Sequence, residues 1–227
     1  MNNKYLDQII HDLKNPLSSI LGLSDLLDKK CSATDQTSKE IIRRIHHHAI
    51  FSLKLVNDLL DLEFLNRKNF SIEKQPTDIE ELAEKTINNH LLLAADRNIA
   101  IAKRIHKNFR LYLDSLRMEQ ILNNLLNNAI KYSPPGSKVV LHTDDYNGFF
   151  YFKITDNGPG LKKEDQIRIF EPFTKINHSS EEQCEGSGLG LSIVKKLVEL
   201  MHGELFVESE ENHGATFIIK LKMEAVE

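Results

Sequence analysis

The first part of the chain carries apolar residues at alternating steps of four and three. The series consists of Leu6, Ile10, Leu13, Leu17 and Ile20, with Ser24 at the next step before Leu27. This spacing is typical of the seam of a coiled coil. It predicts one long amphipathic helix over residues 6–27.

A second segment follows the same spacing and has a wider apolar stripe. Its seam positions are Ile41, Ile45, His48, Ser52, Leu55, Leu59 and Leu62, with Ile42, Ala49 and Val56 beside them. The connection over residues 29–36 is short and polar, so the two helices should pack antiparallel as a hairpin. Because one hairpin cannot cover so wide an apolar face, we expect a homodimer in which two hairpins form a four-helix bundle.

Beyond residue 66 the pattern becomes mixed. The stretch over residues 66–76, with its alternating Phe70 and Ile72, predicts a linker and a first strand. Residues 79–95, 117–131 and 189–201 have the period of helices. Further strands are expected over 99–105, 109–113, 139–143, 149–155, 204–209 and 215–221, with a turn at 146–148. The sequence therefore predicts an α+β chain: a helical hairpin over residues 1–68, then an α/β sandwich over 69–227 with helices on one face of a mixed sheet.

Length and composition agree with two domains. The 227 residues exceed the roughly 100–150 of a typical domain, and 29 basic against 33 acidic residues give a net charge of −4, which argues against nucleic acid as a partner. Cys31 and Cys184 predict neither a disulfide framework nor a zinc site. No stretch is apolar enough to span a membrane, so we expect no membrane contact and a cytoplasmic location. The alternative is the soluble part of a longer, membrane-anchored protein.

The residues around His11 form the first candidate site. His11 falls one residue off the predicted seam, so its ring should face water, with Asp12 beside it and Asn15 one turn further on. A proline inside a helix removes a hydrogen bond and clashes with the carbonyl four residues back, so Pro16 would loosen the helix beside His11. The alternative is a helix that begins here, with Asn15 as its N-cap. The unbroken heptad favours the continuous, kinked helix.

The predicted helix at 117–131 carries amides on one face. Asn124 and Asn128 lie four residues apart, and Lys131 and Tyr132 continue from them. Two amide oxygens on one face can hold a hydrated Mg²⁺ that bridges nucleotide phosphates. The alternative is that an amide merely caps or satisfies a buried group, in a helix that is rich in asparagine throughout.

Two glycine-rich segments follow. Residues 156–160 (DNGPG) come directly after a predicted strand, where glycines let the backbone approach a flat ligand and the Asp156 carboxylate can accept a hydrogen bond from an exocyclic amine such as that of adenine. A plain turn would look similar. Residues 186–191 (GSGLGL) open the last helix, where backbone N–H groups attract phosphate. Leu191 distinguishes this segment from the dinucleotide fingerprint.

Six motifs occur in a fixed order along the chain. They are HDLKNP (11–16), NNLLNNAIKY (123–132), DNGPG (156–160), FEPF (170–173), GSGLGL (186–191) and GAT (214–216). This series resembles the transmitter core of a two-component sensor histidine kinase, and it covers nearly the whole chain. The resemblance implies an ATP-dependent and Mg²⁺-dependent protein-histidine kinase that phosphorylates itself and then a response regulator receiver domain.

The resemblance also implies a role for each matching residue. His11 would be the phospho-acceptor, Asp12 its base, and Asn15 would position water in a reverse, phosphatase reaction. Asn128 would be the principal Mg²⁺ ligand, and Lys175, in a polar lid over residues 161–184, would reach the γ-phosphate. The nucleotide-binding positions implied are Asn124, Asn128, Lys131, Tyr132, Asp156, Gly158, Gly160, Gly186, Gly188, Leu189, Gly190 and Thr216.

Two other functions remain open from the residues themselves. One is an ATP-gated interaction module, as in gyrase-type topoisomerases and mismatch-repair proteins, in which no phosphoprotein forms. The other is a domain that acts mainly as a phosphatase or scaffold. A metal site at residues 46–48 (HHH) is disfavoured, because consecutive helical residues do not share a face.

Overall fold

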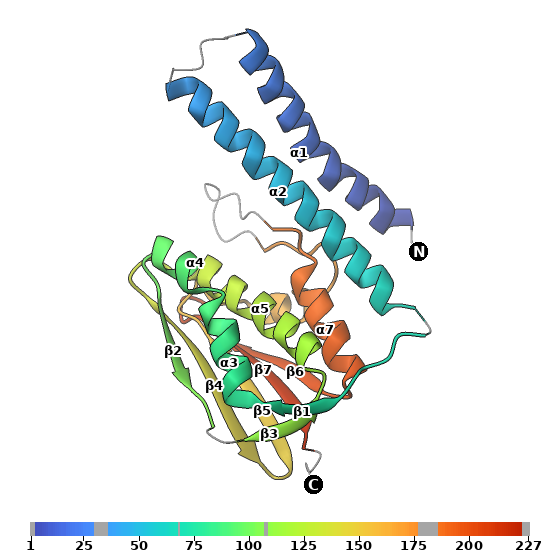
Figure 1. Ribbon diagram of the computed structural model, residues 1–227, viewed down its shortest axis with the longest axis vertical. Coiled ribbons are helices and arrows are strands. Elements are labelled where there is room, and N and C mark those ends of the chain that lie inside the picture. Colours follow the sequence, from blue (N-terminus) through green and yellow to red (C-terminus); the bar gives the residue numbers. More distant parts are fainter. Residues whose placement is uncertain (1–2, 30–35, 68, 107–108, 177–185, 224–227) are drawn as a thin grey trace.

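A helical hairpin projects from an α/β part in the computed structural model (Figure 1). The structure describes residues 3–29, 36–67, 69–106, 109–176 and 186–223. Helix α1 (Asn3–Lys29) packs antiparallel against α2 (Gln36–Leu65), which confirms the predicted hairpin. Most of the predicted connection, residues 30–35, lies outside the described residues. The predicted boundary between residues 68 and 69 stays a prediction.

Helix α1 continues through Pro16. The proline is inside the helix and its side chain is buried, so the alternative in which a helix begins at Asn15 is wrong. Since the apolar period runs on both sides of the proline, packing against α2 retains the helix despite the missing hydrogen bond. Side chains of α1 are described at Leu13 and from Asn15 to Leu27. Those of His11 and Asp12 lie outside the described residues, so the predicted exposure of the His11 ring stays a prediction.

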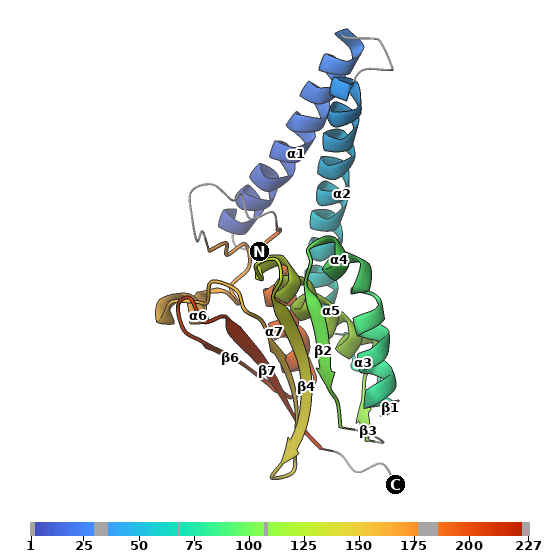
Figure 2. The same cartoon turned by 90° about the vertical axis from the view of Figure 1, so that its left-hand side faces the viewer.

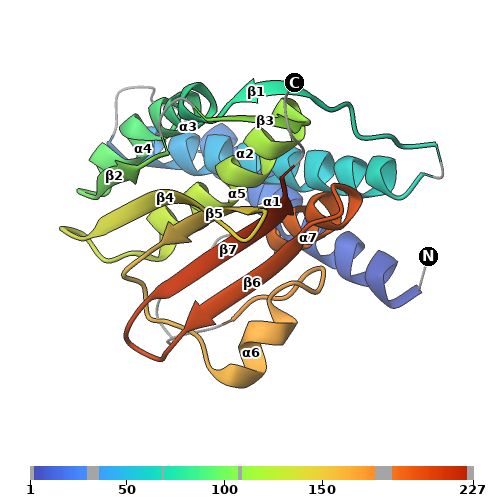
Figure 3. The same ribbon diagram turned by 90° about the horizontal axis from the view of Figure 1, so that it is seen from below.

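A five-stranded sheet forms the base of the α/β part. Its order is β2-β4-β5-β7-β6, with β2 parallel to β4 and the other neighbours antiparallel (Figure 3). The strands are β2 (Ala100–Arg104), β4 (Lys138–Tyr146), β5 (Phe149–Thr155), β6 (Glu204–Ser209) and β7 (Ala215–Lys222). Asn147 and Gly148 close the β4–β5 hairpin with φ values of 51° and 79°, the left-handed pair that matches the twist of the strands. The predicted mixed sheet is confirmed.

Three helices cover one face of this sheet. They are α3 (Ile79–Asn88), α5 (Ser115–Tyr132) and α7 (Gly190–Leu200) (Figure 2). Along β5, Phe150, Phe152 and Ile154 are fully buried and alternate with half-buried residues. The core therefore lies between this face and α5 and α7, as the binary pattern predicts.

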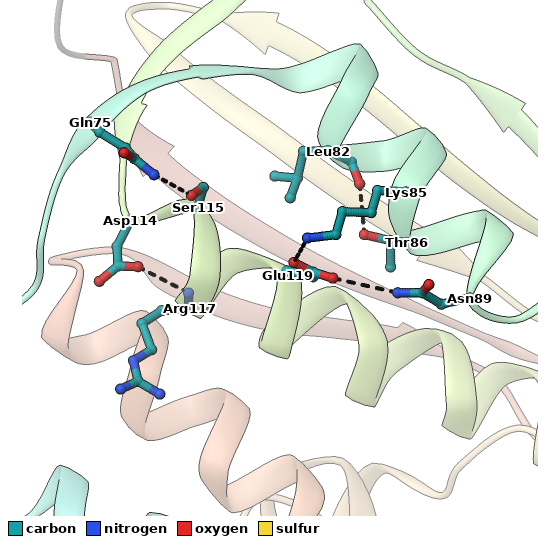
Figure 4. Close-up of polar contacts among 9 residues, drawn as sticks. All are labelled: Gln75, Leu82, Lys85, Thr86, Asn89, Asp114, Ser115, Arg117 and Glu119. Carbon is teal, nitrogen blue, oxygen red and sulfur yellow. Dashed lines mark hydrogen bonds and ion pairs between the residues drawn. The ribbon is translucent and has the colours of Figure 1, made fainter.

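Polar contacts fix α5 in place (Figure 4). At its N-terminus the Asp114 carboxylate accepts a hydrogen bond from the backbone N–H of Arg117 at 3.0 Å, a cap that typically contributes about 1 kcal/mol. One turn further on, Glu119 accepts from the Lys85 ammonium of α3 at 2.8 Å. These contacts hold steady the helix that carries the predicted asparagine face.

A first strand begins within the stretch 66–76, as predicted, but it does not include the alternating residues 70–72. Strand β1 (Gln75–Asp78) pairs with β3 (Arg110–Leu113) in a separate two-stranded sheet. Phe70 packs edge-on against Phe64 of α2, with ring centroids 5.4 Å apart, and the Arg117 guanidinium lies 5.3 Å from its ring. The alternation at 70–72 thus reflects contacts with helices. Pro76 is tolerated in β1 because a short strand on a sheet edge can lack an N–H.

Two helices also depart from the prediction. The expected helix over 79–95 divides into α3 and α4 (Leu91–Asp96), because the His90 ring nitrogen Nδ1 donates to the Thr86 carbonyl at 2.9 Å and ends the first segment. A short helix α6 (Lys163–Arg168) lies beside β6 within the segment expected to be a loop. No helix in the described parts of the chain is long and apolar enough to cross a membrane.

Candidate functional site

A pocket lies where the C-terminal half of α5, the end of β5 and the start of α7 meet. It contains about 610 Å³ of space, counting its open mouth, which is in the range of small-molecule sites. Most of its lining is apolar, with one buried carboxylate, a combination that suits a flat ring system bearing an amine. The lining residues are Asn128, Tyr132, Asp156, Pro159, Gly160, Leu161, Ile169, Thr174, Ile176, Leu191, Ala215 and Phe217.

Asp156 is the polar centre of this pocket. Its side chain is 6% exposed, and its Oδ1 accepts hydrogen bonds from the backbone N–H of Gly158 at 2.8 Å and of Ala215 at 3.2 Å. Burial raises the pKa of this carboxyl, and the two N–H groups act in the opposite direction. Among the described residues nothing donates to Oδ2. One oxygen is therefore fixed by the backbone, while the other can accept a hydrogen bond from a ligand.

Glycines hold the backbone around Asp156. A Cβ on Gly158 would lie 2.9 Å from Asp156 Oδ1, and one on Gly160, whose φ is +69°, would lie 1.9 Å from a backbone carbonyl oxygen. Gly214 has a φ of +78°, and its Cβ would lie 2.1 Å from the Asp156 carbonyl oxygen. Side chains do not fit at these positions. The predicted glycines therefore shape the pocket through close backbone packing.

The predicted asparagine face borders the same pocket. Asn128 and Tyr132 line it. One turn earlier, the Asn124 side chain donates from Nδ2 to a backbone carbonyl at 3.1 Å, and its Oδ1 lies 3.0 Å from the place of a Cβ on Gly190. The Lys131 ammonium lies 3.2 Å from the Tyr132 hydroxyl. The Asn124 amide oxygen and the Lys131 ammonium thus lie beside the glycine-rich loop, while Asn128 and Tyr132 line the pocket.

The glycine-rich loop leads directly into α7. A Cβ on Gly186 would lie 3.0 Å from the Lys131 ammonium, so loop and α5 are close. Gly188 has a φ of +69°, and its carbonyl accepts from the Phe173 N–H at 2.9 Å, which joins the loop to the FEPF segment. The Leu189 side chain is fully buried, so only its backbone can face a ligand. The N-cap residue of α7, Leu189, makes no capping hydrogen bond with its own side chain, and a helix N-terminus favours an anion.

The remaining predicted residues lie at different distances from the pocket. Thr216 is the neighbour of two lining residues, and its hydroxyl lies 3.0 Å from that of Thr155. Lys175 is exposed between the lining residues Thr174 and Ile176. Asn15 is exposed on α1 and does not line the pocket. Residues 177–185 of the predicted lid, with Cys184, lie outside the described residues, as does Cys31.

Sequence reasoning missed Arg97. Its guanidinium donates to the Lys131 carbonyl at 2.9 Å. In a helix this carbonyl would accept from the residue four positions on, which is Pro135 and has no N–H. Arg97 therefore supplies the missing donor and holds the end of α5 beside the pocket. Pro135 is a signal in the sequence, but it does not identify the donor.

Sequence reasoning also missed two carboxylates on α2. Asp58 accepts from the Ser187 hydroxyl of the glycine-rich loop at 2.7 Å, and Asp61 accepts from the Gln120 amide of α5 at 2.8 Å. These contacts join the hairpin to the glycine-rich loop and to α5. The Asp58 contact spans 129 positions along the chain, so no local pattern could have predicted it.

Both parts of the chain match known domain families. Residues 1–67 match the His Kinase A (phospho-acceptor) domain, and residues 113–225 match the ATPase family of histidine kinases, DNA gyrase B and HSP90. The autoinducer 2 sensor kinase/phosphatase LuxQ of Vibrio harveyi is 31% identical over 96% of this chain, which spans 26% of that protein. The circadian input-output histidine kinase CikA of Synechococcus elongatus is 31% identical over 95% of this chain and 29% of its own length. The chain thus spans about a quarter of the length of these relatives.

Solved structures show the same arrangement. Full-length ShkA in complex with AMPPNP superposes with a TM-score of 0.71 at 28% identity, over 100% of this chain and 47% of that one. Histidine kinase ThkA in complex with the response regulator protein TrrA gives 0.80 at 22% identity, over 97% and 61%, and supports the fold. Both parts of the fold, the order of the motifs and the two matched domains agree, and the chain therefore belongs to the two-component sensor histidine kinases as a transmitter core.

Proposed function

We propose that this chain transfers the γ-phosphoryl group of ATP to His11 and then to an aspartate of a response regulator receiver domain. The observation that carries the proposal is the buried Asp156 carboxylate, with Oδ2 without a hydrogen-bond donor among the described residues, in a ligand-sized pocket beside an asparagine face and the N-terminus of α7. ShkA is described with AMPPNP and ThkA with a response regulator, which supports both steps. Because ATP is cytoplasmic, we place the reaction there.

Different residues of the site contact different parts of the nucleotide. Asp156 Oδ2 accepts from the adenine amine, and the apolar lining covers the ring. The phosphates lie toward the glycine-rich loop, where the N-terminus of α7 and the Lys131 ammonium attract negative charge. Asn128, with Asn124 one turn before it, offers neutral oxygens that fit a Mg²⁺ held mainly by phosphates. When bound, this ion neutralises charge that develops during phosphoryl transfer.

His11 supplies the nucleophile. In its neutral form an imidazole carries a lone pair on one ring nitrogen, which can attack the γ-phosphorus. The bond between the γ-phosphorus and the β–γ bridging oxygen breaks, and ADP leaves. Asp12 accepts or orients the proton on the other ring nitrogen. Positioning and charge neutralisation supply most of the acceleration in such reactions.

We also propose that the hairpin dimerises. Both helices expose large aliphatic side chains, for example Leu21 at 66% and Leu53 at 62%. Each such side chain contributes about 1.5–3 kcal/mol when it is fully buried, so pairing of two hairpins is favourable. The other large hydrophobic side chains exposed on the two helices are Leu17, Leu26, Ile42, Ile50, Val56, Leu60 and Phe64.

Radiolabelled ATP tests the kinase reaction. With γ-labelled ATP the unaltered chain should acquire label that is stable to alkali and labile to acid, and His11→Gln should acquire none. His46→Gln, at an exposed histidine of α2, is the matched control and should label normally. Label that persists in His11→Gln would refute the assignment. Nucleotide-dependent dimerisation without label would favour the ATP-gated interaction module.

A phosphatase activity toward the same regulator has a separate observation in its favour. Asn15 is exposed on α1, one turn after His11, where it can position water against a docked acyl phosphate. LuxQ is described as both kinase and phosphatase. Asn15→Ala should keep self-labelling and slow dephosphorylation of the labelled regulator. Equal dephosphorylation rates in both chains would contradict this role.

A further inference from the structure

The glycine-rich loop is hydrogen-bonded to the hairpin. Ser187, between Gly186 and Gly188, is 5% exposed, and its hydroxyl donates to Asp58 Oδ2 on α2 at 2.7 Å. The same hydroxyl oxygen accepts from the Leu189 N–H at 3.1 Å. Leu189 is the N-cap residue of α7. One serine therefore connects the N-terminus of α7 to a carboxylate of the hairpin.

A second contact and an apolar pair support this docking. One turn after Asp58, Asp61 Oδ2 accepts from the Gln120 side chain of α5 at 2.8 Å. Leu55 is 2% exposed and belongs to the same packed core as the fully buried Leu189. Helix α2 thus packs against α7, as Figure 1 shows, and is hydrogen-bonded to α5 and to the glycine-rich loop.

Asp58 lies where it compensates the partial positive charge at the start of α7. The N-terminus of a helix favours an anion, and through Ser187 the carboxylate is two hydrogen bonds from the N-cap residue. A triphosphate bound by the glycine-rich loop would bring further negative charge to the same helix end. Because like charges at a half-buried site repel, docking through Asp58 and binding of a triphosphate should oppose each other.

We propose that the Asp58–Ser187 hydrogen bond is a latch that holds the ATP-binding domain against α2 and is weakened when a nucleoside triphosphate occupies the glycine-rich loop. Asp58 is then a positioning residue: when phosphates of a bound ligand weaken its hydrogen bond, the ATP-binding domain is released from α2 and can move toward His11. The inference rests on the proposed function, since it needs a nucleotide at this loop. Linkage is reciprocal: the factor by which a bound triphosphate weakens the latch is also the factor by which the latch weakens triphosphate binding. Loss of the latch must therefore strengthen triphosphate binding by that factor.

Calorimetric titration of the whole chain tests the latch. Asp58→Asn removes the charge and keeps the shape, so its affinity for Mg-AMPPNP should rise about five-fold or more. Its affinity for adenosine, which has no phosphates, should be unchanged. Glu63→Gln is the matched control, because it removes an exposed carboxylate from the same helix, and it should bind both ligands as the unaltered chain does.

A second variant changes the donor of the Asp58–Ser187 hydrogen bond. Ser187→Ala keeps the Asp58 charge and removes the bond, and it too should raise the ratio of AMPPNP affinity to adenosine affinity. Small-angle scattering should give both variants a larger radius of gyration than the unaltered chain without nucleotide. AMPPNP should remove that difference by releasing the unaltered chain.

The outcomes separate two failures. If the unaltered chain binds AMPPNP but Asp58→Asn and Ser187→Ala bind it equally well, the latch is refuted and the proposed function stands. The latch is also refuted if adenosine affinity rises with AMPPNP affinity, since the effect would then not depend on the phosphates. If the unaltered chain binds neither ligand, the proposed function fails and the latch fails with it.

Discussion

Replacement of Asp156 by asparagine is the most informative change in the base pocket. The substitution keeps size and shape, and an asparagine Oδ1 can still accept from the N–H groups of Gly158 and Ala215. Its Nδ2 then takes the place of Oδ2. A donor would face the adenine amine, which is also a donor, so the hydrogen bond is lost and both groups stay unpaired in a buried site.

The expected loss follows from these contacts. A hydrogen bond to a charged group contributes about 1.5–3 kcal/mol, and leaving a buried donor unpaired costs about 1–3 kcal/mol. Since about 1.4 kcal/mol corresponds to a factor of ten, affinity for adenosine and ATP should fall by roughly 30-fold or more. Stability should change little, because burial already disfavours the charged form of Asp156.

The base itself provides the specificity control. Hypoxanthine carries a carbonyl where adenine carries the amine, so inosine should lose less affinity than adenosine, or gain some, in Asp156→Asn. Titration calorimetry of the two nucleosides gives this ratio directly. The matched variant is Asp114→Asn, because both Asp114 oxygens accept backbone N–H groups, from Glu73 and Arg117, at 3.0 Å and away from the pocket. It should lower the melting temperature and leave the nucleoside ratio unchanged.

Two results would refute the reasoning about Asp156. One is unchanged adenosine affinity in a folded Asp156→Asn chain, which would place the base elsewhere. The other is an equal loss for adenosine and inosine, which would mean that the carboxylate shapes the pocket without contacting the amine.

Three further predictions concern backbone and pH. Gly160→Ala should destabilise the chain by at least about 2 kcal/mol in urea unfolding, since φ is +69° and the Cβ would meet a backbone carbonyl oxygen; Gly22→Ala, an open helical position, should stabilise it instead. Arg97→Ala should cost about 1 kcal/mol in thermal melts and weaken nucleotide binding, because the Lys131 carbonyl loses its donor; unchanged melting would contradict this. Burial raises the pKa of Asp156 above 3.8, so its stabilising contribution is fully present below 3.8 and is lost as pH rises through the raised value, whereas adenosine affinity, which needs the carboxylate, falls as pH drops through it. Asp156→Asn should remove both dependences.

Elements with a strong period could be predicted from the sequence. Strand β5 was expected at residues 149–155 and occurs there, because strict alternation and the Asn147-Gly148 turn both fix its register. Helix α5 lies within two residues of its expected bounds, since its apolar face is fully buried. In these segments the local pattern and the tertiary packing favour the same structure.

Other features depend on contacts between distant residues and could not be predicted. The first strand expected within 66–76 begins only at Gln75, because Phe70 packs on Phe64 of α2 and beside Arg117, contacts that local alternation does not reveal. The break between α3 and α4 depends on one histidine that donates to a carbonyl of the preceding turn. The link between Asp58 and Ser187 exists only once the hairpin and the α/β part meet.

The glycines of the site illustrate where sequence reasoning stops. Their pattern predicts that the backbone approaches a ligand closely, and it does not distinguish one glycine from another. In the structure, Gly160, Gly188 and Gly214 have positive φ values, and a Cβ on any of them would meet backbone atoms. The fold itself therefore requires glycine at these three positions. Gly186 and Gly190 have ordinary φ values, and a Cβ there would approach only the side chains of α5, 3.0 Å from the Lys131 ammonium and from Asn124 Oδ1. Those two glycines keep space open between the loop and the side chains of α5, so a side chain there would fill the space in which we propose that the phosphates bind.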